Sequence, residues 1–201
     1  MEEEQPLLAR LGNTLKTHVM LLGGIIVFLW LVEVVDAVIF HGSLDRYGVQ
    51  PRTVIGLRGI IFAPVLHGGF GHLMANTIPF LLMGWFVLMR GTWEFVAVTG
   101  ITAVTSGLGA WLFGAPNSVH IGVSGVIMGY FGYLLMRGYF ERSLTAVLWS
   151  IFIIILYGGL LWGVLPGQNG VSWQSHLFGF LGGGLAAYWL AKSKRAEGGL
   201  G

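Results

Sequence analysis

The sequence predicts an all-α membrane protein built as a bundle of six transmembrane helices. Composition is the first observation: 55% of the 201 residues are hydrophobic, only 10% are charged, and the mean hydropathy is +0.76. Such values exclude an ordinary water-soluble domain. The second observation is a series of largely apolar stretches about 20 residues long, the length that crosses a ~30 Å hydrocarbon core. Because backbone polar groups cannot stay unpaired in lipid, these stretches are predicted to be helices.

The six predicted spans follow one another along most of the chain. They lie at residues 19–40, 72–90, 93–113, 122–141, 144–165 and 174–191. Very short turns join the second span to the third and the fourth to the fifth, whereas residues 41–71 form a long first loop that is too short and too mixed for a separate domain. We therefore expect an N-terminal segment (1–18), a six-helix membrane domain (19–191) and a polar, mobile C-terminal tail (192–201). No A-x-A-like cleavage site follows the first apolar run, so we expect this span to be retained.

The basic residues predict the orientation of the chain, because Lys and Arg concentrate on the cytoplasmic side of membrane proteins. Eight of the eleven fall on one side of the predicted spans: Arg10, Lys16, Arg90, Arg137, Arg142, Lys192, Lys194 and Arg195. The other three, all in the first loop, are Arg46, Arg52 and Arg58. Both termini should therefore face the cytoplasm, and the expected setting is a multi-pass protein of a bacterial or archaeal plasma (inner) membrane.

Composition also excludes other kinds of function. The basic residues sit beside apolar segments, where they act as topology signals, so no nucleic-acid partner is predicted. The chain has no cysteine, which excludes a disulfide, a thiolate metal site and a thiol nucleophile. The predicted surroundings of the six-helix domain are the lipid bilayer.

Three polar side chains recur at equal spacing within the apolar spans. His72, Ser124 and His176 are 52 residues apart, and each interval contains two predicted membrane crossings. All three therefore fall at the same depth, near the outer ends of the second, fourth and sixth spans. Asn76 lies one helical turn below His72 on the same face. If the three helices pack together, these four side chains converge.

The converging groups suffice for acyl transfer, which needs a hydroxyl nucleophile, an imidazole base and donors aimed at the developing oxyanion. Ser124 and His176 supply the first two. The predicted oxyanion donors are the Ser124 backbone N–H, which has no partner inside its own helix, and the side chains of His72 and Asn76. The alternative interpretation of a single intramembrane histidine is a hydrogen-bonded packing residue or a proton relay.

Glycines surround the serine and follow the second histidine. Gly122 can take backbone angles closed to other residues and let the chain come close to a substrate carbonyl. Gly125 and Gly129 would let another helix pack tightly on the fourth span, and Gly179 and Gly183 would do the same on the sixth. The two helices could then approach closely enough for the imidazole to reach the hydroxyl. Small-xxx-small patterns also occur in many membrane helices for packing alone.

Three motifs in this order resemble the rhomboid intramembrane serine proteases in their basic six-helix form. They stand here as HGGFGHLMAN (67–76), GVSGVIMG (122–129) and SHLFGFLGG (175–183). The resemblance extends from Val19 to Ala191 and covers essentially the whole chain. Together the three motifs are far more specific than a lone G-x-S-G.

The resemblance implies a role for each of the converging residues. By position, Ser124 would be the nucleophile, His176 the general base, and His72 and Asn76 the donors on the oxyanion side. The implied activity is an intramembrane serine endopeptidase that uses no metal and no cofactor. Its implied substrates are single membrane-spanning segments with a small residue before the cut and a locally unstable helix.

This sequence departs from the family pattern in two places. Many members carry an aromatic residue four positions after the serine, where it stacks on the basic histidine, whereas this chain has Met128. A thioether can pack against an imidazole but donates no hydrogen bond, so other neighbours are expected to orient His176. The Trp-Arg pair often found in the first loop is also missing. His67 matches a further histidine of the family, and either a loop-capping or a functional role is open to it.

Other intramembrane proteases do not fit these residues. A zinc enzyme needs H-E-x-x-H, which does not occur. An aspartyl enzyme needs two carboxylates on separate helices, but the only candidates, Glu33 and Asp36, are three residues apart on one predicted helix. We expect both carboxylates to be structural and to pair with a first-loop arginine or with His41.

Two functions other than proteolysis remain as alternatives. The first is a catalytically inactive rhomboid-like protein that binds and escorts membrane proteins; such a protein would usually lack Ser124 or His176. The second is a proton-coupled transporter that uses His72, His120 and His176 as a relay. Six spans without an inverted repeat argue against a transporter, and His120 is then expected to be a surface residue.

The outer loop before the last span predicts an adjustable cap over the site. Residues 163–175, GVLPGQNGVSWQS, contain Pro166, Gly167 and Gly170, which favour a non-helical segment. With the fifth span, this segment would yield to admit a membrane substrate.

Overall fold

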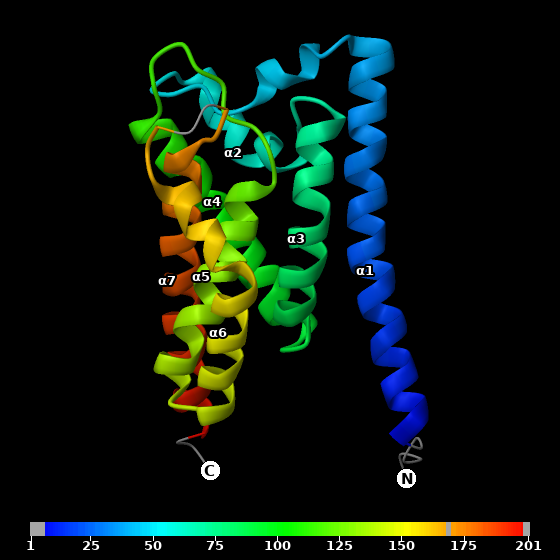
Figure 1. The fold of residues 1–201 in the computed structure, drawn as a ribbon, viewed down its shortest axis with the longest axis vertical. Coiled ribbons are helices and arrows are strands. Elements are labelled where there is room, and N and C mark those ends of the chain that lie inside the picture. The colour runs from blue at the N-terminus through cyan, green and yellow to red at the C-terminus, as the bar shows by residue number, and fades with distance from the viewer. Residues whose placement is uncertain (1–6, 168–169, 199–201) are drawn as a thin grey trace.

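Figure 1 shows the fold of the chain in a computed structural model that describes residues 7–167 and 170–198. Over these residues the chain forms six long helices, several short ones and no strand. The long helices are α1 (Leu7–Val35), α3 (Phe70–Leu88), α4 (Thr92–Phe113), α5 (Ser124–Glu141), α6 (Leu144–Tyr157) and α7 (Trp173–Gly198). One of them lies at each predicted span, so the all-α fold class is confirmed.

Four helical segments of the described chain are long and apolar enough to cross a membrane: Gly12–Phe40, Phe70–Leu88, Thr92–Phe113 and Leu144–Val164. The last of these joins α6 to a short 3-10 helix, η5 (Gly158–Val164). α5 and α7 are less apolar because they carry glycines, serines and charged residues. The exact count of six spans therefore stays a prediction.

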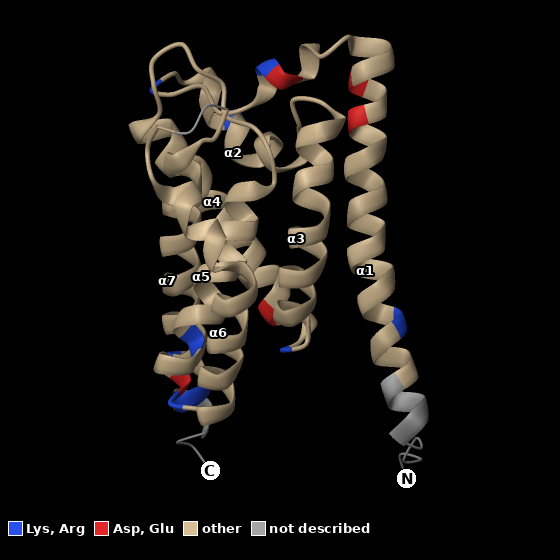
Figure 2. Ribbon diagram, in the orientation of Figure 1, with Lys and Arg blue, Asp and Glu red and all other residues tan. Residues whose placement is uncertain are grey.

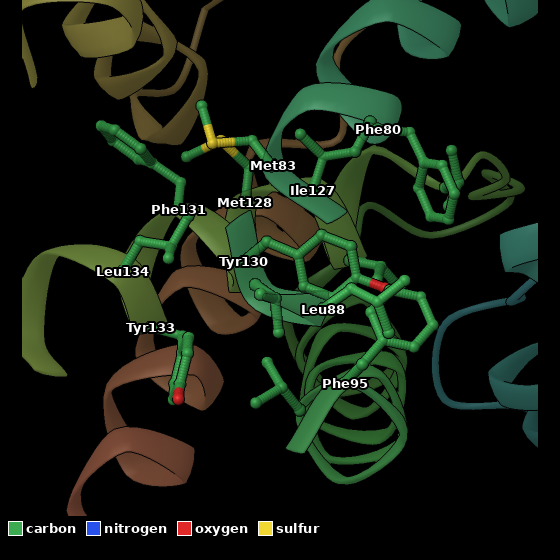
Figure 3. Close-up of a cluster of buried hydrophobic side chains, with 14 of the residues drawn as sticks. Phe80, Met83, Leu88, Phe95, Ile127, Met128, Tyr130, Phe131, Tyr133 and Leu134 are labelled. Carbon is green, nitrogen blue, oxygen red and sulfur yellow. The ribbon is translucent and has the colours of Figure 1, made fainter. Parts of the chain in front are cut away.

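α5 is the central helix of the bundle. α3, α4, α6 and α7 pack around it, while α1 lies at the edge and packs on α3 (Figure 1). Figure 3 shows the buried side chains that α5 shares with its neighbours. Phe80 of α3 and Phe95 of α4 place their ring centroids 5.9 and 5.7 Å from that of Tyr130. Because lipid is as apolar as these side chains, their close van der Waals packing holds the helices together.

Glycines let α5 and α7 touch backbone to backbone. A Cβ atom added at Gly179 would lie 2.0 Å from the carbonyl oxygen of Gly125, and one added at Gly183 would lie 1.9 Å from that of Gly129. No side chain other than hydrogen fits at this separation. The contact fixes the beginning of α5 beside the beginning of α7, which are the positions of Ser124 and His176.

The two ends of the bundle differ from its middle in charge. Figure 2 shows Lys, Arg, Asp and Glu at the two ends, with apolar helix between them. α1 begins and α7 ends at the same end (Figure 1), as an even number of crossings requires. We call this the inner end and the opposite one the outer end. That the inner end faces the cytoplasm stays a prediction; the side chain of Arg10, which contributed to it, lies outside the described part.

The first loop folds into short helices at the outer end. They are η1 (Asp36–Phe40), η2 (Ser43–Tyr47), η3 (Ile55–Arg58), α2 (Gly59–Phe62) and η4 (Ala63–Val65). The loop is tied to the end of α4, where Trp111 Nε1 donates to the Thr53 carbonyl oxygen at 2.8 Å. Arg52 donates to the carbonyl oxygens of Leu112 and Gly114 at 3.1 and 2.8 Å. A positive charge at these last, otherwise unpaired carbonyls is favourable.

The prediction that the two buried carboxylates, Glu33 and Asp36, pair with a first-loop arginine or with His41 is wrong. Asp36 Oδ1 accepts from the Leu44 backbone N–H at 3.0 Å, and the Glu33 carboxylate lies beside the backbone of Gly69. No ion pair joins either of them to an arginine or to His41 within the described residues. The physical reason is that other groups already satisfy both kinds of side chain. Backbone carbonyl oxygens accept from Arg52 and Arg58, and Arg46 lies over the Tyr47 ring. Backbone N–H groups serve the two carboxylates.

Residues 192–198, part of the predicted C-terminal tail, are helical, because α7 continues through Gly198. Lys194 Nζ lies 2.5 Å from Glu94 Oε1 and 3.6 Å from Glu141 Oε1. These ion pairs join α7 to α4 and α5 at the inner end. At the other terminus α1 already begins at Leu7, inside the expected N-terminal segment. Residues 1–6 and 199–201 of the two predicted terminal segments lie outside the described residues.

Candidate active site

Ser124 and His176 meet between the outer ends of α5 and α7. Ser124 is the first residue of α5, and His176 lies in the first turn of α7. The Ser124 Oγ is 2.8 Å from the His176 Nε2, a normal hydrogen-bond distance. The structure thus brings the two residues predicted to be catalytic within hydrogen-bond distance of each other.

The second ring nitrogen of His176 fixes which way this hydrogen bond runs. Nδ1 lies 3.0 Å from the carbonyl oxygen of Gly163 in η5. A carbonyl oxygen can only accept, so in the neutral ring the proton is on Nδ1 and donates to Gly163. Nε2 then carries the lone pair and accepts from the Ser124 hydroxyl. This is the arrangement that a general base for serine requires.

The sequence left open which group orients His176, because Met128 stands where an aromatic residue is common. In the structure the Gly163 carbonyl orients the ring. Met128 is 2% exposed and lies one turn after Ser124 on α5. Sequence reasoning missed Gly163, since its contribution is a backbone carbonyl that every residue type possesses. A Cβ atom added at Gly163 would lie 2.9 Å from His176 Nδ1, so this close approach needs a glycine.

The imidazole of His72 packs directly against Gly122. Gly122 has φ +109°, a backbone conformation that side chains disfavour, and a Cβ atom there would lie 2.8 Å from His72 Cε1 and 2.9 Å from Nε2. The His72 Nδ1 accepts from the Gly68 backbone N–H at 3.3 Å. In the neutral ring the proton is therefore on Nε2, the nitrogen beside Gly122. His72 presents a donor toward the chain that leads into Ser124.

Two further donors at the site have no acceptor in the described part of the chain. Asn76 is 8% exposed, and its Nδ2 is buried without a partner. The Ser124 backbone N–H, at the start of α5, also lacks an acceptor among the described residues. Buried donors are nearly always paired, so an unpaired amide beside a serine hydroxyl is what a site for a transient oxyanion would show.

Two hollows meet at Ser124 and His176. The outer cavity, about 580 Å³, is also lined by His72, Asn76 and His120. The lateral pocket, about 240 Å³, lies between α3, α5 and η5, and its walls include Asn76, Met128 and Trp162. Both hollows therefore reach the Ser124 hydroxyl.

His67 supports the loop segment that leads into Ser124. It is 2% exposed, and its Nε2 accepts from the Val123 backbone N–H at 3.4 Å. Its ring centroid lies 5.1 Å from that of His72. Burial, and next the neighbouring His72, lower the pKa of His67 to about 4. At neutral pH the ring is therefore uncharged, as its acceptor role requires.

His120 is half-buried and holds the end of the predicted cap. Its Nδ1 lies 2.6 Å from Ser172 Oγ and its Nε2 2.9 Å from Ser118 Oγ. Burial lowers the pKa of His120. The expectation of a surface residue is wrong, because His120 is half-buried and bonded to Ser172. No sequence pattern could predict its pairing with a serine 52 residues away. Its partners are hydroxyls rather than His72 or His176, which gives the relay of a proton transporter no support.

Comparison with known proteins assigns a family to this architecture. The family model described as the Rhomboid domain matches residues 56–193. An uncharacterised protein of Mycobacterium tuberculosis is 42% identical over 193 residues, which cover 92% of this chain and 77% of that protein. An uncharacterised protein of Mycobacterium leprae is 41% identical over 83% of this chain and 69% of its own length. RHOMBOID-like protein 5 of Arabidopsis thaliana is 36% identical over 71% of this chain and 46% of its own length.

Proposed function

This chain belongs to the rhomboid family, and from that premise we propose that it is an intramembrane serine endopeptidase. The proposed reaction is hydrolysis of a peptide bond in a transmembrane segment, near the outer membrane face, by Ser124 and His176. The observation that carries the proposal is the 2.8 Å contact between Ser124 Oγ and His176 Nε2. The Gly163 carbonyl supports it by holding the imidazole in the tautomer of a base.

In the first step the Ser124 Oγ attacks the scissile carbonyl carbon while its proton passes to His176 Nε2. The carbonyl π electrons move to the oxygen and form a tetrahedral oxyanion. When this intermediate collapses, the C–N bond breaks and the imidazolium gives its proton to the leaving amine. A water then attacks the acyl-serine ester with His176 again as base, which releases the new carboxyl end and restores the Ser124 hydroxyl.

The oxyanion would be stabilised by the three donors around the serine. Their residues, Ser124, His72 and Asn76, all line the outer cavity. Such donors are worth most where water is excluded and where they need no reorganisation during the reaction. Their lack of described partners in the resting site fits this role.

The imidazolium would be stabilised without a carboxylate. The Gly163 carbonyl dipole faces Nδ1, the nitrogen that carries the proton throughout the cycle. A fixed carbonyl orients the ring as the third residue of a triad does, although with less charge. Gly163 belongs to η5, at the start of the proposed cap (163–175), so the cap and the base are physically connected.

Substrates are proposed to enter sideways from the bilayer. The lateral pocket opens between α3 and η5 and reaches Ser124 past mostly apolar residues. A single-span membrane protein with a small residue before the cut and a locally unstable helix would fit this route. Movement of the cap and α6 away from α3 would admit it, in the plasma membrane orientation that the basic residues predict.

The second candidate is a catalytically inactive rhomboid-like protein that binds membrane proteins. Some members of the family are inactive, so membership alone does not decide between the two. The experiment that separates them is cleavage of a single-span reporter protein in proteoliposomes by the wild type and by Ser124→Ala. Cleavage by the wild type alone would support the protease; binding without cleavage by both would support the escort protein.

A further inference from the structure

The inner end of the bundle contains a third hollow, separate from the catalytic one. Arg137 on its wall lies 13 residues after Ser124 on α5, about 20 Å along the helix. This inner pocket is lined by Phe86, Arg90, Arg137, Thr145, Trp149 and Ile153. It lies where the end of α3, the second half of α5 and the first half of α6 meet. Its volume is about 140 Å³.

The polar wall of the inner pocket carries positive charge. The side chain of Arg137 is only 10% exposed, and its Nε lies 3.3 Å from Glu141 Oε2. The guanidinium of Arg90 lies 3.3 Å from Glu141 Oε1. With Lys194 and Glu94, these side chains form a network of three basic and two acidic groups, and one positive charge is left uncompensated.

The two arginines have nitrogen atoms to spare on the side of the inner pocket. Among the described residues, the only hydrogen bond of the Arg137 side chain uses Nε. No described residue accepts from its two terminal nitrogens. Arg90 pairs through NH2 with Glu141 and through Nε with Glu94. The Thr145 hydroxyl, exposed at the mouth, adds a neutral donor. Guanidinium groups match the geometry of phosphate oxygens.

The mouth of the inner pocket is apolar and faces the outside of the bundle. The rings of Phe86 and Trp149 lie 5.3 Å apart, and Trp149 is 41% exposed. Met89, which also lines the pocket, is 55% exposed. In a multi-pass membrane protein these side chains contact lipid. Trp is the residue type that anchors helices at the level of the lipid headgroups.

We propose that the inner pocket binds an anionic phospholipid of the surrounding leaflet. The phosphate would lie between Arg90 and Arg137, and an acyl chain would run along Phe86 and Trp149. The inner pocket has arginine side chains inside and apolar side chains at its lipid-facing opening. This combination fits an amphiphile with an anionic headgroup, and basic pockets between transmembrane helices are known to bind such lipids. The inference does not depend on the proposed protease activity.

Binding of phospholipids to the detergent-solubilised full chain tests this proposal by native mass spectrometry. The probes are dioleoyl phosphatidylglycerol, dioleoyl phosphatidylcholine and inorganic phosphate. We expect the wild type to bind phosphatidylglycerol about tenfold more tightly than phosphatidylcholine. Arg137→Gln and the pocket-filling Thr145→Phe should abolish this preference. Lys192→Gln, which removes a charge at the same end on α7 but outside the pocket, should keep it.

Thr145→Phe keeps the test decisive if Arg137→Gln does not fold, because it leaves every described ion pair in place. Equal affinity for the two lipids in the wild type would overturn the proposal. So would a preference that both pocket variants retain. Inorganic phosphate should not displace phosphatidylglycerol at equal concentration; displacement by phosphate would assign the pocket to a soluble anion instead of a lipid.

Discussion

The His176 Nδ1 lies 3.0 Å from the carbonyl oxygen of Gly163, and through this contact the proposed cap holds the proposed base. The opposite ring nitrogen faces the Ser124 hydroxyl at 2.8 Å. A shift of η5 would therefore change both the entrance to the site and the tautomer and angle of the imidazole. In the proposed mechanism, this one hydrogen bond links substrate admission to catalytic geometry.

Gly163→Ala should impair the base without unfolding the protein. The new Cβ would lie 2.9 Å from His176 Nδ1 and push the ring away from Ser124. We expect kcat to fall about 10- to 100-fold, since small displacements of reacting groups carry such costs. The measurement is cleavage of a single-span substrate in proteoliposomes. Gly158→Ala at the start of the same 3-10 helix is the matched control, because its Cβ would meet only Ile154 Cγ2, at an ordinary contact distance of 3.7 Å, and Gly158 does not line the lateral pocket; equal losses in both variants would refute the role of Gly163.

Asn76→Ala should remove one donor to the oxyanion. We expect a 10²- to 10³-fold lower kcat with little change in KM, as for other oxyanion donors. Because Asn76 Nδ2 has no partner in the described residues, the unfolding midpoint should barely move. Thr77→Val is the contrasting variant: it breaks the contacts with Trp30 Nε1 and the Leu73 carbonyl, so it should lower the midpoint and leave kcat within about twofold. A stability loss in Asn76→Ala without a kcat effect would contradict this account.

Gly179→Ala should separate α5 from α7. Its Cβ would collide with the Gly125 carbonyl oxygen at 2.0 Å, and overpacking of this kind costs about 1–3 kcal/mol. The unfolding midpoint in detergent should drop, and cleavage should fall at least 100-fold as the dyad opens. Gly100→Ala on α4, where a Cβ meets nothing within 4 Å, should match the wild type in both assays. An active Gly179→Ala would show that the helix contact does not set the Ser124–His176 distance.

A reducible cross-link between α3 and α6 should block the proposed gate. Phe86 and Phe152 are in ring contact across the two helices, 6.4 Å between centroids, and the chain has no cysteine to interfere. A ring contact does not bring the Cβ atoms within the ~3.8 Å that a direct disulfide needs, so the cysteines of Phe86→Cys/Phe152→Cys are joined with a bifunctional methanethiosulfonate reagent. We expect the cross-link to abolish cleavage of a membrane substrate and reduction to restore it. Small fluorophosphonates should label Ser124 in both states, because they enter through the outer cavity. Undiminished cleavage by the cross-linked protein would eliminate lateral opening.

His67 should make stability depend on pH. Its folded pKa of about 4 lies below the unfolded value of about 6.5, so the unfolded chain takes up the proton first on acidification. The contribution of His67 is therefore complete above about pH 6.5 and is lost as the pH falls to about 4, by roughly 3 kcal/mol at 1.36 kcal/mol per pKa unit.

The measurement is the unfolding midpoint between pH 4 and 7.5. His67→Gln should flatten the decline relative to the wild type, whereas His41→Gln, an exposed position in the first loop, should follow the wild type. Parallel curves for the wild type and His67→Gln would show that the burial of His67 does not control this decline.

The sequence predicted what depends on residue type and spacing. Apolar length located the long helices, and equal spacing brought Ser124, His72 and His176 to one depth. Residue type and spacing could not predict contacts between residues that are distant in the chain. Lys194, in the segment predicted to be a tail, pairs with Glu94, which lies 100 residues away in the chain. The Gly163 carbonyl that orients His176 leaves no trace in the sequence, because every residue carries a carbonyl group.

The most direct test of the proposed mechanism is fluorophosphonate labelling of the purified protein in detergent, with the modified residue mapped by mass spectrometry. The account predicts labelling of the wild type at Ser124, none in Ser124→Ala, and none in His176→Ala, each variant having a thermal unfolding midpoint close to that of the wild type. A folded wild type that stays unlabelled, or a His176→Ala variant labelled as fast as the wild type, would contradict an activated serine.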